Sequence, residues 1–368
     1  MKIPFVDLKE QYLSIKENID KAIYNVIDET AFIGGKYVQK FESDFAKKYG
    51  IKNCISVANG TDSLYIIMKM LGIGNGDEVI TVSNSWISSS ETITQVGASV
   101  VFVDIDPVYY TINADLIESK ITEKTKAIMP VHLYGQMCDM KKILNIAANY
   151  NLYVIEDCAQ SHFSEYEGHR AGTFGIAGSF SFYPGKNLGA YGDAGCIITN
   201  DDELAEKCRT YARHGAKVKH KHIMEGINSR LDGIQAAILS EKLPHILEWT
   251  KKRIQNAVLY TELLKDVPEI VCPVIRENTL HSFHLYVVKA SNRNGLIQYL
   301  TEKGIETAIH YPTALPNLPA YKYHGSRPND FPVSSANQEV ILSLPMYPEL
   351  TLDQINYIAK TIIKFYKY

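Results

Sequence analysis

Short apolar runs alternate with segments of helical periodicity along the first two thirds of the chain. Residues 54–57 form one such run, and apolar side chains between Leu64 and Leu71 then recur at the spacing of one helix face. Further runs occupy residues 78–82, 100–105, 127–131 and 152–156. The connections are long enough to hold the crossover helices that parallel strands require. The pattern therefore predicts an α/β fold, in which helices cover both faces of a mostly parallel sheet.

The pattern changes after about two thirds of the chain. Two more strands are predicted at 179–183 and 196–199, and helices at 201–213 and 231–243. A long helical stretch over 246–265 is followed by a break at Val267 and Pro268, after which a new α/β pattern begins. We therefore expect a large domain over 1–245, then a connector helix and a small C-terminal domain over 246–368.

The composition is that of an ordinary globular protein, with 46% hydrophobic and 21% charged residues in 368. The net charge of -3 gives no overall positive field that would attract nucleic acid or an anionic membrane. The six cysteines show no C-x-x-C pairing, and the first residues meet a charge too early for a signal peptide. We expect a cytoplasmic protein that binds neither nucleic acid nor a membrane.

Several common nucleotide-binding and hydrolase motifs are excluded by spacing. Lys186 follows a glycine, but Asn187 stands where a P-loop has Ser or Thr. The glycines at 72–76 follow a predicted helix and lack the third spaced glycine of a dinucleotide fingerprint. Neither a G-x-S-x-G nor an H-E-x-x-H motif occurs in the sequence.

A single lysine, Lys186, lies in a glycine-rich loop that follows the predicted strand at 179–183, and Glu156 and Asp157 end another strand upstream. Ligands of open α/β sheets gather outside the carboxyl ends of the strands. An amine and a buried carboxylate in such a place suit pyridoxal phosphate, whose protonated ring nitrogen an acid such as Asp157 stabilises. The structural alternative for the acid is a residue that caps the next helix or pairs with a surface lysine, and the alternative for Lys186 is a solvated lysine.

Gly60, Thr61, Asp62 and Ser63 lie between the first predicted strand and its helix. Free N–H groups and the positive end of the helix dipole can bind a phosphate there. The same residue types are ordinary helix N-caps, which is the alternative interpretation. Because an acid and a lysine follow other strands, we expect Gly60, Thr61 and Asp62 to bind the cofactor.

Motifs spread over nearly the whole chain resemble those of one enzyme family. They occupy residues 60–64, 130–135, 156–162 (EDCAQSH), 178–189 (GSFSFYPGKNLG), 226–232 (GINSRLD) and 310–312. Together they are similar to the DegT/StrS-type nucleotide-sugar aminotransferases. The resemblance implies the type I fold of pyridoxal-phosphate-dependent transferases, similar to aspartate aminotransferase, and a homodimer with active sites at the subunit interface.

The resemblance also implies roles for individual residues. Lys186 is expected to form the Schiff base with the cofactor and to move the proton during catalysis. Asp157 is expected to pair with the pyridine nitrogen, and Gln160 to reach the ring hydroxyl.

Other residues are expected to hold the phosphate and the ring. Thr61 and Ser181 match positions that bind the cofactor phosphate, and Asn228 matches one that reaches the cofactor phosphate of the neighbouring subunit. Trp86 is expected to lie against the ring face, where stacking contributes about 0.5 to 1.5 kcal/mol. A buried core tryptophan is the alternative for Trp86.

The implied reaction transfers an amino group from an amino acid, glutamate, to a nucleotide-linked ketosugar, with pyridoxamine phosphate as the intermediate form of the cofactor. Residues 187–193 look more like relatives that act at carbon 3, so we expect a dTDP- or UDP-3-keto sugar. Amination of a 4-keto sugar is one alternative. A regulatory or binding protein on the same fold, without turnover, is the other.

A basic segment at 214–222 precedes Asn228 and contains Lys219 and His220, which are candidates for binding the substrate diphosphate. A solvated basic loop is an equally good interpretation. His162, His310 and Tyr311 are further candidates for substrate contacts. No acid or thiol completes a metal site at a familiar spacing, so we expect no bound metal.

Overall fold

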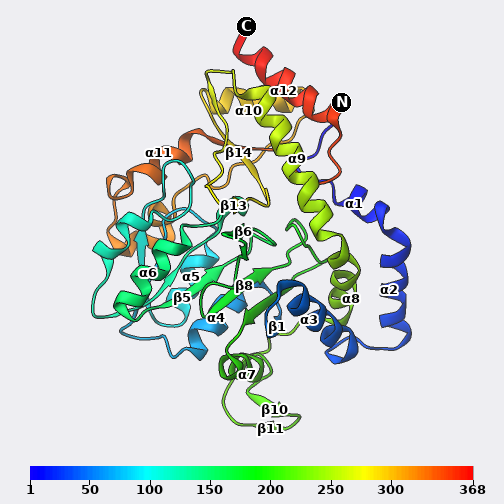
Figure 1. Cartoon of the computed structure of the whole chain (residues 1–368), viewed down its shortest axis with the longest axis vertical. Helices are drawn as coiled ribbons and strands as arrows, with labels where there is room; N and C mark the ends of the chain where they lie inside the picture. The colour runs from blue at the N-terminus through cyan, green and yellow to red at the C-terminus, as the bar shows by residue number, and fades with distance from the viewer. Residues whose placement is uncertain (368) are drawn as a thin grey trace.

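The computed structural model describes residues 1–367 and contains a seven-stranded central sheet (Figure 1). The strands are β1 (Asn53–Val57), β2 (Glu78–Val82), β3 (Ser99–Val103), β4 (Thr125–Met129), β5 (Tyr153–Asp157), β8 (Ala177–Ser181) and β9 (Gly195–Thr199). They lie in the order β1-β9-β8-β5-β4-β2-β3. β9 is antiparallel to both neighbours, and every other neighbouring pair is parallel. The prediction of a mostly parallel sheet is confirmed.

Helices cover both faces of this sheet. One face carries α3 (Gly35–Tyr49), α6 (Met140–Tyr150) and α8 (Gly233–Lys242), and the other carries α4 (Gly60–Met70), α5 (Ser88–Gln95) and α7 (Asp202–Tyr211). Successive strand residues point to opposite faces, so Val79 and Ile80 belong to different apolar clusters. This two-sided burial explains why the strands are apolar along their whole length.

Side-chain caps fix where the helices of the sheet begin. The carboxamide oxygen of Asn59 accepts the N–H of the third residue of α4, at 2.8 Å. Asp139 and Asp201 cap α6 and α7 in the same way. Each cap satisfies an N–H group that a helix leaves unpaired, and it fixes how the chain enters the helix from the strand end.

A second unit follows the long helix α9 (Ile246–Leu264) and lies at the top of Figure 1. Its antiparallel sheet has the order β12-β14-β15, with bounds Ile270–Val271, Tyr286–Ala290 and Ile341–Leu344. Helices α10 (Arg293–Glu302) and α12 (Leu352–Lys367) pack with α9 around a separate apolar cluster. These elements form a second α/β unit, smaller than the first.

Several segments cross the proposed division of the chain at residues 245 and 246. Ile3 is buried in the apolar cluster of the small unit. In the other direction, Leu315, Tyr321 and Phe331 pack against one face of the large sheet. The strand β13 (Thr279–Leu280) pairs with β6 (Glu165–Tyr166), which also pairs with β7 (His169–Arg170). The domain boundary remains a proposal.

The remaining elements lie at the periphery of the large sheet. Helices α1 (Leu8–Ser14) and α2 (Lys16–Asp28) run along one side, and α2 packs against α8. The hairpin of β10 (Ala216–Val218) and β11 (Lys221–His222) projects beyond α7 at the lower end of Figure 1. Helix α11 (Pro332–Val340) lies beside the sheet, because Asp104 at the end of β3 accepts the backbone N–H groups that begin it.

Two further findings bear on the expected setting of the protein. Within residues 1–367, the helices include none that combines the length and the apolar character needed to cross a bilayer. All six cysteines are unpaired; five are buried, and only Cys272 is partly exposed.

Candidate active site

The carboxyl ends of several strands of the large sheet surround a cavity of about 430 Å³. Most of the predicted site residues line it: Gly60, Thr61, Trp86, Asp157, Gln160, Ser181, Lys186, His310 and Tyr311. They come from segments far apart in the sequence, which the parallel strands bring to one edge of the sheet.

Lys186 lies in a tight turn just after β8. Its backbone N–H donates to the Tyr183 carbonyl at 2.8 Å, and the Ala190 N–H donates to the Phe182 carbonyl at 2.8 Å. A Cβ at Gly189 would lie 2.3 Å from the Pro184 carbonyl oxygen, so only glycine fits this path. The sequence therefore closes the turn and directs the amine into the cavity.

The charge of Lys186 depends on its surroundings. Burial disfavours the ammonium ion and lowers the pKa of the Lys186 amine to about 8, although the nearby Asp157 carboxylate raises it in part. A substantial fraction of the amine is therefore uncharged slightly above neutral pH. An uncharged amine can act as a nucleophile or accept a proton.

Asp157 ends β5 and is almost fully buried. Its Oδ2 atom accepts the Ser89 hydroxyl at 2.8 Å, and its Oδ1 atom accepts the Ala159 N–H at 3.1 Å. These two donors fix the orientation of the carboxylate at the wall of the cavity. The acid is thus not a surface residue paired with a lysine, which was the structural alternative.

The first turn of α4 forms the other end of the cavity. Asn59 accepts the N–H groups of Asp62 and Ser63, and the hydrogen bonds of the described residues leave those of Gly60 and Thr61 without an acceptor. A Cβ at Gly60 would lie 2.7 Å from the Ser181 Cβ, so the helix approaches the strand more closely than another residue would allow. Asp62 belongs to this turn but does not line the cavity. The turn is suited to bind an anion.

Gln160 is held by polar contacts at both ends of its amide. Its Oε1 atom accepts the Tyr134 N–H at 2.7 Å, and its Nε2 atom donates to the Tyr311 hydroxyl at 2.9 Å. The Tyr134 hydroxyl in turn donates to the His310 carbonyl. One N–H of the Gln160 amide remains for a ligand in the cavity.

Trp86 is 59% exposed and lies at the cavity, with its ring centroid 5.9 Å from that of Tyr311. A core position for this tryptophan is therefore excluded. Trp249, the other tryptophan of the chain, is the one that is buried. An exposed aromatic ring at a cavity wall offers a stacking surface to a planar ligand.

Some residues of the cavity were not identified from the sequence. Ser89 holds Asp157, the Ser88 hydroxyl lies 2.7 Å from the Thr61 hydroxyl, and Tyr183 is an exposed wall residue. Both serines lie in the first turn of α5, the helix that follows β2, so their position after a strand end could have indicated them. Tyr134 lies inside a quoted motif, but nothing in the sequence indicated its contact with Gln160.

His162 is fully buried between Phe180 and Phe182 and does not line the cavity. Neither ring nitrogen has a hydrogen-bond partner among the described residues. Burial, with the nearby Lys186 ammonium, lowers the pKa of His162 to about 3, so its ring is neutral. In this structure the side chain does not reach the cavity where a substrate would bind.

Asn228, Lys219 and His220 lie away from the Lys186 cavity. Lys219 and His220 line a second pocket of about 400 Å³, together with Arg213 and Arg230. Asn228 is exposed and pairs through its backbone with Arg213. Within one chain, these residues are not part of the same site as Lys186.

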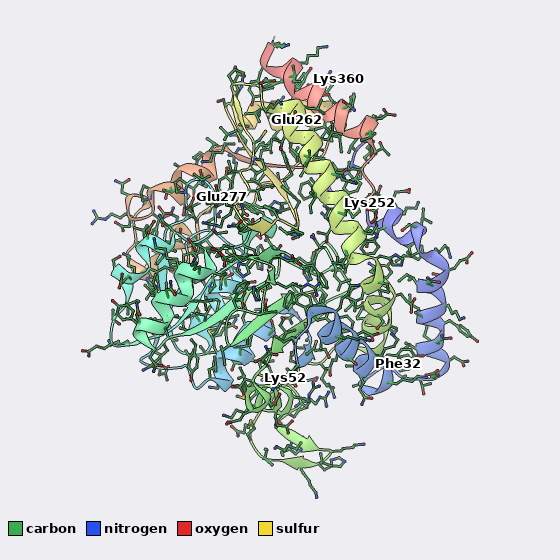
Figure 2. The ribbon with its side chains drawn as sticks, viewed as in Figure 1. Phe32, Lys52, Lys252, Glu262, Glu277 and Lys360 are labelled. Atoms are coloured by element: carbon green, nitrogen blue, oxygen red, sulfur yellow. The ribbon has the colours of Figure 1, made fainter. Side chains whose placement is uncertain are left out.

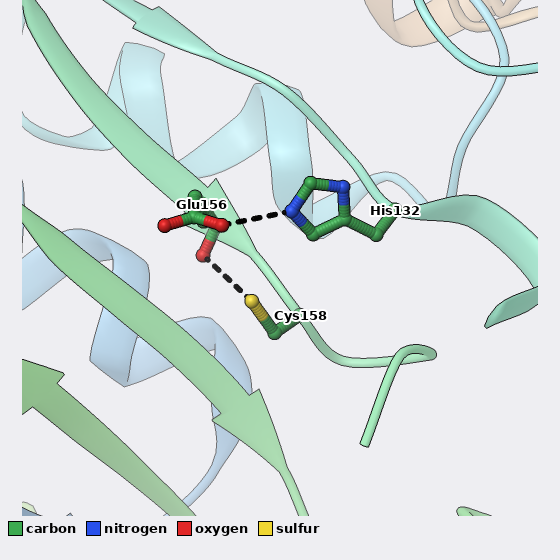
Figure 3. A group of neighbouring side chains, drawn as sticks. All are labelled: His132, Glu156 and Cys158. Atoms are coloured by element: carbon green, nitrogen blue, oxygen red, sulfur yellow. Dashed lines mark hydrogen bonds and ion pairs between the residues drawn. The ribbon is translucent and has the colours of Figure 1, made fainter. Parts of the chain in front are cut away.

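His132, Glu156 and Cys158 form the one buried group, within residues 1–367, whose ligand atoms lie close enough to hold a metal ion (Figure 3). The Glu156 carboxylate already accepts hydrogen bonds from His132 Nε2 and from the N–H groups of Gly172, Phe174 and Gly175, at 2.7 to 3.0 Å. The other His132 nitrogen accepts the Cys138 N–H. These bonds anchor the 172–175 turn beside β5. They account for the burial of the polar side chains of this group.

Comparison with known proteins gives the same assignment over the whole chain. Residues 13–363 match the DegT/DnrJ/EryC1/StrS aminotransferase family. A "pleiotropic regulatory protein" of Geobacillus stearothermophilus is 44% identical, with 100% of both chains covered. A dTDP-3-amino-3,6-dideoxy-alpha-D-galactopyranose transaminase of Aneurinibacillus thermoaerophilus is 42% identical, with 99% of both chains covered.

The fold has a close counterpart among solved structures. The crystal structure of S. venezuelae DesV in complex with a ketimine intermediate superposes with a TM-score of 0.98 at 36% identity, covering 100% of this chain and 99% of that one. The expected type I fold and the family resemblance are both confirmed. The chain belongs to the DegT/DnrJ/EryC1/StrS aminotransferase family.

Proposed function

We propose that this protein transfers the amino group of glutamate to carbon 3 of a dTDP- or UDP-linked 3-keto sugar. The general activity follows from the family. The chain is a transaminase of nucleotide-linked sugars that uses pyridoxal 5'-phosphate, with pyridoxamine 5'-phosphate as the amino form of the cofactor. The observation that carries the proposal is the presence of the Lys186 amine and the Asp157 carboxylate in one cavity.

The cavity fits this cofactor at five points. The open N–H groups of Gly60 and Thr61, with the Ser181 hydroxyl, suit its phosphate. The carboxylate of Asp157 suits its ring nitrogen, and the remaining N–H of Gln160 suits its ring hydroxyl. Trp86 offers a stacking surface, and the amine of Lys186 suits its aldehyde carbon.

When bound, the cofactor supplies a carbon that carries the amino group and a ring that withdraws electrons from the substrate carbon. Lys186 Nζ accepts a proton from the substrate carbon. It returns this proton to the cofactor carbon that carries the amino group. Its lowered pKa allows both steps, because the amine gains and loses a proton near neutral pH. Asp157, fixed by Ser89, holds positive charge at the ring nitrogen throughout.

The assignment to carbon 3 is supported by the relative whose name describes a 3-amino sugar and by the sequence of residues 187–193. Glutamate as donor is supported by the family resemblance. Amination of a 4-keto sugar is the alternative reaction. The unpaired thiols support the proposed cytoplasmic setting, since free cysteines persist in a reducing compartment.

We further propose that two copies of the chain share their active sites. Asn228 and the basic pocket lie outside the Lys186 cavity of their own chain, which supports a role at the site of a partner. Exposed apolar residues near that pocket offer a contact surface: Phe32 (labelled in Figure 2), Ile33, Val218 and Ile223. Lys219 and His220 would then bind the diphosphate of the sugar.

A regulatory protein without turnover is the second candidate function, favoured by the name of the 44% identical relative. The two functions differ in one measurement. A transaminase loaded with cofactor changes its visible absorption when glutamate is added, whereas a protein that only binds the cofactor does not.

The test of the proposed function uses purified enzyme, glutamate, and dTDP-, UDP- and GDP-linked 3-keto and 4-keto sugars, with aminosugar detected by mass spectrometry. We expect product from a dTDP- or UDP-3-keto sugar, and none with Lys186→Ala. Lys360→Ala, an exposed lysine of α12 labelled in Figure 2, is the matched control and should keep full activity. Product from 4-keto sugars alone would overturn the assignment to carbon 3, and turnover by Lys186→Ala would overturn the role of the lysine.

A further inference from the structure

Lys242, the last residue of α8, is a completely buried lysine that the proposed reaction does not use. Its amine donates to the Gln11 carboxamide oxygen at 3.0 Å and to the Gly189 carbonyl at 2.8 Å. It also lies 4.2 Å from the ring centroid of Tyr191. All of these partners are neutral, so no carboxylate compensates the charge by direct contact.

Such an arrangement is costly for a residue that only fills space. Burial lowers the pKa of the Lys242 amine to about 8, although the more distant Glu349 raises it in part. A methionine of similar size would fill the same volume without the cost of desolvating an ammonium ion. The presence of a buried amine is therefore best explained by the groups to which it donates hydrogen bonds.

One of these groups, the Gly189 carbonyl, belongs to the loop that carries Lys186. Gly189 closes the turn in which the Lys186 N–H donates to Tyr183 and the Ala190 N–H donates to Phe182. The same helix holds the loop a second time, because Gln235 Oε1 accepts the Tyr191 N–H at 2.8 Å. Helix α8 thus fixes the backbone on the C-terminal side of Lys186.

The residue directly after Lys186, Asn187, is held from another direction. The Asn187 amide donates to the Ser282 carbonyl at 3.1 Å, and its oxygen lies 3.2 Å from His284 Nδ1. The segment with Lys186 is therefore held on two sides. Residues that lead into the small unit contact it on one side, and helix α8 contacts it on the other. Loss of the contact on one side would let the loop shift toward the other.

We infer that Lys242 is a positioning residue: its amine, through the Gly189 carbonyl, sets where the Lys186 amine lies in the cavity. The inference rests on the proposed role of Lys186 as the residue that moves the proton. A displacement of about 1 Å in a reacting group can lower the rate ~100-fold. The contact therefore affects turnover without touching substrate or cofactor.

The test compares Lys242→Met, Lys242→Arg and the exposed control Lys252→Met on α9 (Figure 2), all as cofactor-loaded enzyme. Amide hydrogen exchange in a peptide covering 183–191 reports on the loop, and steady-state kinetics report on turnover. We expect at least ~10-fold faster exchange of the Lys186 and Ala190 amides in Lys242→Met, with kcat lowered ~10- to 100-fold and KM for the sugar nearly unchanged. Lys242→Arg should recover most of kcat, and Lys252→Met should match the parent.

Two results would overturn the inference. One is unchanged loop exchange in Lys242→Met. The other is faster exchange spread evenly over β2 and β4 as well, which would indicate a general loss of stability. If Lys242→Met does not fold, Lys242→Gln, a shorter neutral donor, is measured against the same criteria. Turnover by Lys186→Ala would overturn the role of the lysine, and the absence of product from every sugar tested would end the proposed function. Neither result would change the exchange of the loop in the Lys242 variants.

Discussion

The hydroxyl of Ser89 donates a hydrogen bond to the carboxylate of Asp157, with 2.8 Å between Oγ and Oδ2. Both side chains are buried, one on α5 and the other at the end of β5. The serine is thus placed to keep the acid aimed into the cavity. Its removal should therefore affect catalysis more than folding.

For Ser89→Ala we expect kcat to fall about 10-fold, since the carboxylate loses one of two donors, and stability to fall by about 1 kcal/mol. Steady-state kinetics and urea unfolding measure the two effects. Ser119→Ala removes an exposed serine hydroxyl and should change neither. A large loss of stability with normal kcat would show that Ser89 serves only the fold.

The pH dependence of Lys186 gives a test that needs no substrate. In cofactor-free protein, acetylation of the Lys186 amine should rise through a midpoint near pH 8, because burial lowers its pKa to about 8. The ordinary pKa of a lysine amine is 10.5. Peptide mass spectrometry after brief acetic anhydride treatment measures the profile. Asp157→Asn should move the midpoint lower still, since the aspartate raises the pKa; a midpoint near 10 would contradict the burial of the amine.

The same group should affect stability in a defined direction. Its folded-state pKa of about 8 lies below the ordinary value of 10.5, so between these pH values the unfolded chain binds more protons. Stability from this group therefore increases as the pH rises from 8 to 10.5. Urea unfolding of cofactor-free protein, compared with Lys186→Met, should show the parent gaining on the variant across this window. A difference that stays flat would contradict it.

Gly60→Ala should disturb both the fold and the anion site. The new Cβ would lie 2.7 Å from the Ser181 Cβ, and the helix must move to relieve the contact. We expect a loss of about 1 to 3 kcal/mol and a smaller gain in melting temperature when pyridoxal phosphate is added. Gly74→Ala, where the nearest atom would be 3.4 Å away, is the control and should keep the normal gain.

The two tryptophans should respond differently to substitution by leucine. Trp86 is exposed at the cavity, so Trp86→Leu should leave stability within about 0.5 kcal/mol but weaken cofactor binding about 2- to 10-fold through lost stacking. Trp249→Leu should instead destabilise the protein, because that ring is buried. Cofactor titration and thermal unfolding separate the two. Unchanged cofactor affinity in Trp86→Leu would remove the proposed stacking.

Glu156→Leu should destabilise the protein by about 3 to 5 kcal/mol, since four donors, two of them fully buried, would lose their acceptor. Thermal unfolding of the variant measures this loss. A chelator should leave the melting temperature of the parent unchanged, because hydrogen bonds already account for the group. A chelator-induced drop would instead reveal a metal bound beside His132.

Much of the sheet could be predicted from the sequence, because short runs that are apolar along their whole length are typical of strands buried on both faces. The strand at 78–82 has the predicted bounds, whereas the strand predicted at 179–183 lies at Ala177–Ser181. The chain turns at Tyr183 to bring Lys186 inward, and this turn ends the ladder before the apolar pattern ends. Strand ends at a functional loop follow the loop rather than the periodicity.

The site itself was only partly predictable. Lys186, Asp157 and the turn at Gly60 follow strand ends, so topology places them together. The contacts of Tyr134 and Ser89 depend on side-chain directions that no spacing encodes. The separation of Asn228 from the cavity could not be derived from the periodicity of one chain. Only the resemblance indicated it, by assigning this residue to a neighbouring subunit.

The uneven burial of the thiols has a practical consequence. Because Cys272 alone among the six cysteines reaches the surface, a maleimide dye should attach to the small unit of the unmodified protein at one position. A fluorophore there would report on its surroundings without cysteine-removing mutations, and its emission could follow motion of the small unit while glutamate and sugar are added in turn. The chain thus carries its own attachment point for an optical reporter.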